Sequence, residues 1–80
     1  MLSIIYQIIG AVIREIRVSS KISQSRLAEY TNKDRQYIYK IEQGKVTPNI
    51  VTIAILSKAL DVSLKEIFEK LYQDNSGNKF

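Results

Sequence analysis

The sequence predicts an all-α domain built from five short helices. Apolar residues recur three and four positions apart in several stretches, which is the period of a helix with one buried face. Serine, aspartate, asparagine, glycine and proline, which start or stop helices, stand between these stretches. With 80 residues and a hydrophobic fraction of 45%, the chain can build one core. We therefore expect a single domain over residues 1–72, followed by a disordered polar tail over residues 73–80.

The first apolar run, MLSIIYQIIGAVI, indicates a core helix over residues 3–18 and no membrane association. It lacks the basic start of a signal peptide, and Arg14 and Glu15 interrupt it well before the roughly 18–20 residues that a bilayer requires. The inward positions are Ile9, Ile13 and Ile16. Ile4 and Ile8 widen this apolar stripe, so a partner could cover part of it.

Two short helices separated by a tight turn are predicted over residues 24–30 and 34–43. Ser23 stands before the first helix and Asp34 stands at the start of the second, and both side chains can accept a backbone N–H at a helix start. The turn contains Asn32, which tolerates the left-handed conformation, and Gly44 ends the second helix. Two amphipathic helices joined in this way have the outline of a helix-turn-helix unit.

The last two helices are predicted from the same signals. Thr47 is the expected cap of the fourth helix, with Pro48 at its first position. Its buried face is expected to contain Ile50, Ile53, Leu56 and Leu60. Ser63 is the expected cap of the fifth helix, which carries Leu64, Ile67, Phe68 and Leu71.

Composition narrows the class of function. The chain has no Cys and no His, which argues against a disulfide, a metal site or any cofactor and suits a reducing cytoplasm. It has no glycine-rich phosphate loop and no convergent carboxylates, so we expect no enzyme. The net charge is +4, and residues 21–45 carry six basic and three acidic side chains. The basic excess therefore lies on the helix-turn-helix unit, where DNA phosphates would attract it.

The helix predicted over residues 34–43 carries side chains that suit DNA bases. If Ile38 and Ile41 face the core, the outward arc contains Arg35, Gln36, Tyr39, Lys40 and Gln43. Arginine can donate twice to guanine and glutamine can pair with adenine, while Lys40 and Lys45 are also placed for phosphates. Tyr37 could contact a thymine methyl group or a phosphate, or pack under the preceding helix. The alternative for the whole face is an amphipathic helix that only meets water.

A family resemblance covers residues 8–68. Its motifs are Ser23-Gln24, Leu27-Ala28-Glu29, Ile38, Ile41-Glu42 and Gly44-Lys45. In these positions the chain resembles the Cro/CI-type (XRE-like, lambda-repressor-like) helix-turn-helix family. Asp34-Arg35 followed by Tyr37-Ile38 is also similar to restriction–modification controller proteins, which are small dimeric regulators.

The resemblance implies roles for residues around the predicted recognition helix. Gln24 would touch a phosphate and brace that helix. Arg17 and Glu42 would form a salt bridge between the first and third helices. A second phosphate cluster would comprise Lys45, Thr47 and Asn49. Independently of the resemblance, Tyr37 is counted with the expected phosphate contacts because of its place on the helix. The chain departs from the family pattern at Lys33, usually apolar, at Tyr39, usually small or polar, and at Asp61, usually glycine.

The expected function is sequence-specific binding of double-stranded DNA by a transcriptional regulator, either a repressor or an autoregulatory controller. The helix at 34–43 would enter the major groove, with Arg35, Gln36, Tyr39 and Lys40 reading bases. A homodimer would bind an inverted repeat, through an interface formed by Ile67, Phe68, Leu71 and Tyr72. Leu64, Ile67 and Phe68 could instead close the monomer core. The alternative function is a protein-interaction module or an antitoxin, and the expected protein partners are a toxin or polymerase.

Overall fold

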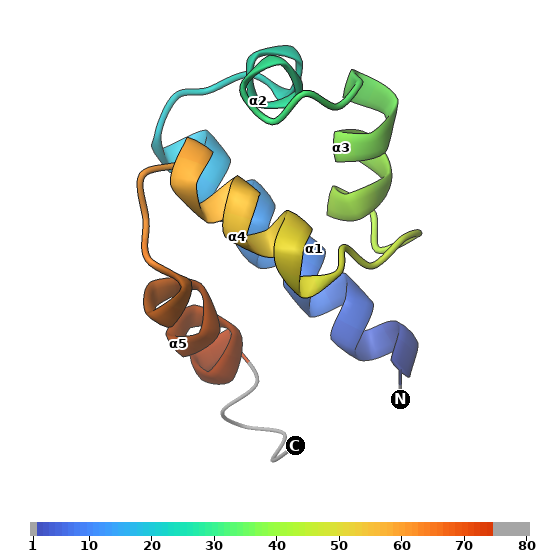
Figure 1. Ribbon diagram of the computed structural model, residues 1–80. Helices are drawn as coiled ribbons and strands as arrows, with labels where there is room; N and C mark the ends of the chain where they lie inside the picture. Colours follow the sequence, from blue (N-terminus) through green and yellow to red (C-terminus); the bar gives the residue numbers. More distant parts are fainter. Residues whose placement is uncertain (1, 75–80) are drawn as a thin grey trace.

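The computed structural model describes residues 2–74, which form five α-helices and no strand (Figure 1). They are α1 (Leu2–Ser19), α2 (Gln24–Tyr30), α3 (Arg35–Glu42), α4 (Ile50–Ala59) and α5 (Leu64–Asp74). The all-α prediction is confirmed. Helix α5 includes Gln73 and Asp74, which had been expected in the polar tail, and the rest of that tail lies outside the described residues. Over residues 2–74, no helix combines the length and the apolar character needed to cross a membrane.

Side-chain caps start the last four helices. In each case an oxygen of the cap accepts the N–H of the residue three positions on, which satisfies a donor that the helix leaves unpaired. The caps and their donors are Ser23 and Arg26 at 3.0 Å, Asp34 and Tyr37 at 2.8 Å, Asn49 and Thr52 at 2.9 Å, and Ser63 and Glu66 at 3.0 Å.

The start of α4 corrects the prediction from Thr47 and Pro48. Asn49 is the cap, and the helix begins at Ile50. Proline disfavours helical geometry in the residue before it, and asparagine is a stronger cap than threonine. Pro48 is therefore a buried loop residue that precedes the helix.

The first four helices all end in a left-handed residue. At each end the N–H of the next residue donates to the carbonyl five positions back, as in the Schellman motif. The left-handed residues are Lys21, Asn32, Gly44 and Asp61, with φ between 57° and 74°. The closing bonds join Ile22 to Arg17, Lys33 to Ala28, Lys45 to Lys40 and Val62 to Ser57, at 2.8–3.1 Å.

The core gathers apolar side chains from all five helices. The largest fully buried ones are Val12, Ile13, Leu27, Ile38, Ile41, Leu56 and Ile67. Helix α1 packs against α3 and α5, while α2 packs against α3 and α4. At Gly10 the backbones of α1 and α3 approach so closely that a Cβ would collide with the carbonyl oxygen of Ile41.

The buried face of α4 differs from the predicted one. Ile53, Leu56 and Leu60 are buried as expected, but Ile50 is 57% exposed. Thr52 and Ser57 are buried instead. The Ser57 hydroxyl donates to the carbonyl of Ala54 at 2.7 Å, so it enters the core with its hydrogen bond satisfied.

Candidate nucleic-acid interface

Helix α3 presents a polar and basic face to solvent. Ile38, Ile41 and Glu42 are buried, which fixes the rotation of the helix about its axis. The predicted outward arc is exposed in full and comprises Arg35, Gln36, Tyr39, Lys40 and Gln43. The four residues predicted to read bases therefore lie together on one accessible surface.

A basic hollow lies beside the start of this face, between α2 and α3. Its volume is about 510 Å³, and its charged lining comprises Arg26, Lys33, Arg35 and Glu29. Ser23 and Ser25 add hydroxyl groups to the same lining. The three cations outnumber the single carboxylate, so the hollow favours anions.

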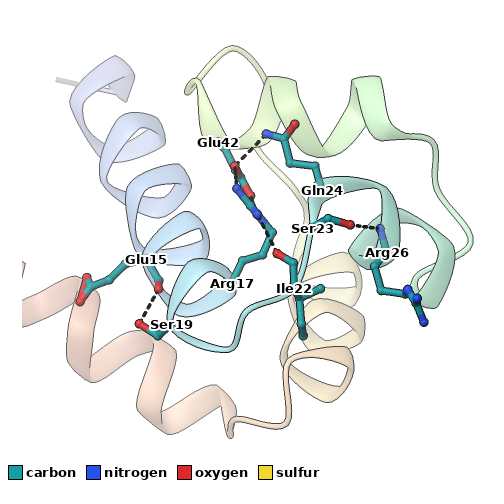
Figure 2. A network of polar contacts seen from close by, with 8 residues as sticks. All are labelled: Glu15, Arg17, Ser19, Ile22, Ser23, Gln24, Arg26 and Glu42. Atoms are coloured by element: carbon teal, nitrogen blue, oxygen red, sulfur yellow. Dashed lines mark hydrogen bonds and ion pairs between the residues drawn. The ribbon is translucent and has the colours of Figure 1, made fainter.

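A buried network fixes α3 relative to α1 and α2 (Figure 2). Arg17 donates to both carboxylate oxygens of Glu42, from Nε to Oε2 at 2.6 Å and from Nη2 to Oε1 at 3.1 Å. Its Nη1 donates to the carbonyl of Ile22 at 2.7 Å. Gln24 Nε2 also donates to Glu42 Oε1, at 3.0 Å. The structure thus contains the ion pair expected between Arg17 and Glu42, and Gln24 braces α3 from the first position of α2.

Because this network is buried, its hydrogen bonds are needed to keep the charged groups stable inside the protein. The Glu42 side chain is fully buried and the Arg17 side chain is 11% exposed. A buried carboxylate is stable only when its oxygens are paired. Within residues 2–74, no buried side-chain nitrogen or oxygen lacks a hydrogen-bond partner. We therefore assign the network to holding α3 in place.

The predicted phosphate-binding residues divide into two groups. Lys45, Thr47 and Asn49 are exposed in the segment between α3 and α4, although the Asn49 side chain also caps α4. Gln24 is half-buried against Glu42. Tyr37 is half-buried and packs against the core, and the Lys33 ammonium lies 5.2 Å from its ring centroid.

The predicted dimer surface on α5 is only partly available. Ile67 is 2% exposed and belongs to the monomer core, so it has no surface to offer a partner. Leu64 and Leu71 are half-buried against that core. Phe68 and Tyr72 are exposed, at 43% and 69%, and line the same shallow hollow. Phe68 is therefore not part of the buried core.

An apolar surface on α4 was missed by sequence reasoning. Ile50, Val51 and Ile55 are all exposed on this helix. The signal was present in the run IVTIAIL, which is apolar on every side of a helix and so typical of a helix covered all round. Assigning only one buried face to it left the outer face unexplained.

Comparisons with known proteins agree with this geometry. Residues 13–67 match the family model described as Helix-turn-helix. An HTH-type transcriptional regulatory protein of Methanococcus maripaludis is 42% identical over 55 residues, which are 69% of this chain and 17% of that protein. The HTH-type transcriptional regulator PuuR of Escherichia coli is 39% identical over 61 residues, 76% of this chain and 33% of PuuR. The chain thus spans about a third or less of these relatives.

A solved structure is similar over nearly the whole of both chains. It is the restriction–modification controller protein C.Esp1396I, as a tetramer in complex with its natural 35-base-pair operator. The identity is 31% and the TM-score is 0.82, and the match covers 88% of this chain and 92% of the other.

Proposed function

This chain belongs to the helix-turn-helix family of DNA-binding transcriptional regulators, and we propose that it binds an inverted-repeat operator as a homodimer. The observation that carries the proposal is the exposed face of α3, held in place by the buried Arg17–Glu42 network. A base-reading helix must be rigid, because its side chains have to reach base edges without further ordering. The operator complex of C.Esp1396I, which matches over 88% of this chain, supports the same mode of binding.

The base-reading roles follow from position on α3. Arg35 and Gln36 lie in its first turn, the part that enters a major groove most deeply. The Arg35 guanidinium can donate to O6 and N7 of guanine, and the Gln36 amide can pair with N6 and N7 of adenine. Lys40 lies one turn further on, within reach of a base edge or a phosphate.

Phosphate contacts would set the register of the helix in the groove. Lys45, Thr47 and Asn49 stand on the exposed segment that follows α3. Gln24 keeps one amide N–H beyond the one it gives to Glu42, and that group could reach a phosphate at the start of α2. These contacts carry little sequence information themselves.

Dimerisation would use the exposed apolar side chains of α5, Phe68 and Tyr72, together with the accessible part of Leu71. A two-fold dimer would place two copies of α3 about 34 Å apart, one turn of B-DNA. The antitoxin alternative relied on Ile4, Ile8 and Leu71 as a joint surface. Ile8 and Leu71 pack against the core, so this surface is smaller than expected.

The test is selection of bound duplexes from a randomised DNA pool, at about 150 mM salt so that purely ionic binding is suppressed. We expect enrichment of an inverted repeat. Enrichment of a single half-site would contradict the dimer, and salt-sensitive binding without any enrichment would contradict base reading.

A further inference from the structure

Two tyrosines of α3 each have a lysine ammonium group above the aromatic ring. The Lys33 ammonium lies 5.2 Å from the centroid of the Tyr37 ring, and the Lys45 ammonium lies 5.9 Å from that of Tyr39. Lys33 belongs to the turn before α3, and Lys45 follows its end. Within residues 2–74, neither ammonium forms a salt bridge with a carboxylate.

The two tyrosines lie on different sides of the outward face of α3. Residues 37 and 39 are two positions apart, which corresponds to about 160° when the angle is measured across the outward side of the α-helix. The outward residues Gln36, Lys40 and Gln43 lie between the two tyrosines, and Arg35 lies beyond Tyr39. A helix in the major groove has a sugar–phosphate backbone along each side, so two lysines supported by tyrosines this far apart can reach different strands.

We propose that Lys33–Tyr37 and Lys45–Tyr39 are two phosphate-binding units, one for each strand bordering the major groove. This inference rests on the proposed DNA-binding function. It adds Lys33 as a phosphate ligand and changes the role of Tyr39 from reading a base to positioning Lys45.

The physical advantage is preorganisation. An exposed lysine samples many rotamers and loses that freedom when it binds a phosphate. The face of a tyrosine ring attracts the ammonium and restricts the side chain before DNA arrives. Part of the ordering cost is then already met in the free protein, which raises affinity without a new contact. Tyr37 is itself held by the core, so it is a fixed support for Lys33.

The first test measures affinity as a function of salt, on a duplex carrying the selected operator and on a scrambled duplex of equal length. Lys33→Met and Lys45→Met should each reduce the slope of log affinity against log salt by about 0.9 on both duplexes, the value for one phosphate contact. Lys58→Met is the matched control, because Lys58 is exposed on α4 and its loss changes the net charge equally. It should leave the slope unchanged.

The second test separates positioning from base reading at Tyr39. Tyr39→Leu should weaken operator binding about two- to fivefold, as expected for losing an exposed cation–π contact. The effect should disappear in a Lys45→Met background. Tyr39→Phe retains the ring and should keep wild-type affinity and base preference.

Unchanged salt slopes for Lys33→Met and Lys45→Met would overturn the proposal. A change in base preference with Tyr39→Phe would also overturn it, since Tyr39 would then read a base. Either result leaves the proposed function intact if Arg35→Ala still loses affinity at one base position. A wild-type protein that binds neither duplex would overturn the proposed function, and this inference with it.

Discussion

At the scale of single residues, Arg17 and Glu42 show how burial decides the strength of an interaction. The Glu42 carboxylate is fully buried and accepts hydrogen bonds from Arg17 and Gln24. Arg26 and Glu29 also form an ion pair, at 3.8 Å, but both side chains are exposed. Water screens the exposed pair, whereas the buried carboxylate has no replacement partner.

Arg17→Met should therefore lower the free energy of unfolding by about 3–5 kcal/mol, because it leaves the Glu42 charge buried without its cation. Urea denaturation followed by circular dichroism measures this change. Arg26→Met is the control and should cost less than about 1 kcal/mol. Equal small losses in both variants would show that the Arg17 network does not hold α3.

Arg35→Ala should cost roughly 1–3 kcal/mol of binding free energy at one base position of the operator. The guanidinium would be lost from the first turn of α3, where it is exposed and not needed for folding. Competition assays with operators substituted one base pair at a time measure the effect. Equal weakening on every duplex would show that Arg35 contacts a phosphate and does not read a base.

At the scale of helices, the periodicity of apolar residues does not explain every position. The close approach of two helices explains one position, and the geometry of a helix end explains another. Gly10 lies where α1 meets the carbonyl oxygens of Ile41 and Glu42. Lys21 follows the end of α1 and has a φ of 59°, a left-handed conformation that is unfavourable for a residue with a Cβ.

Gly10→Ala should destabilise the protein by about 1–3 kcal/mol, because the added Cβ collides with backbone that cannot rotate away. The sign of the change in stability is informative, since a Gly→Ala substitution at an unconstrained helix position would stabilise the protein by up to about 1 kcal/mol. Thermal and urea unfolding measure it. A more stable variant would mean that α1 and α3 separate easily.

Lys21→Gly should stabilise the protein by about 0.5–1 kcal/mol, because glycine adopts the left-handed conformation without the Cβ penalty. Asn32→Gly is the matched control at the end of α2 and should have a smaller effect, since asparagine tolerates this conformation. Urea unfolding compares the two variants. A loss of stability in Lys21→Gly would indicate that the Lys21 side chain stabilises the protein by more than its left-handed backbone conformation destabilises it.

At the scale of the whole molecule, the described part of the chain buries one core and leaves apolar side chains exposed on α4 and α5. Figure 1 shows α3 and α5 on different sides of α4, so a partner on α5 need not cover the recognition face. Exposed apolar side chains that gather on one surface are typical of interaction sites. The α5 surface is therefore the place where the proposed dimer is tested.

Phe68→Glu should convert the proposed dimer to monomer at tens of micromolar protein, because a charge would be buried in an apolar interface. Sedimentation velocity measures the change. Ser25→Glu is the control, since Ser25 is exposed on α2, which packs against α3 and α4. A wild-type protein that is already monomeric would contradict the dimer.

Most of the fold was predictable because its signals are local. The caps Ser23, Asp34 and Ser63 act over three residues, and Asn32 and Gly44 end their helices within one turn. The exposed arc of α3 followed from the spacing of Ile38 and Ile41 alone. The roles of individual side chains in DNA binding stay predictions.

The sequence by itself determined the number and order of the helices and the outward face of α3, because caps and helical period depend on near neighbours. Only the tertiary structure decided that Ile50 lies outside the buried face of α4, since Ile50 and Ile53 are equally apolar and the packing of α2 and α5 selects between them. It also decided that Lys45 lies over Tyr39, because that contact depends on the path of the chain after α3.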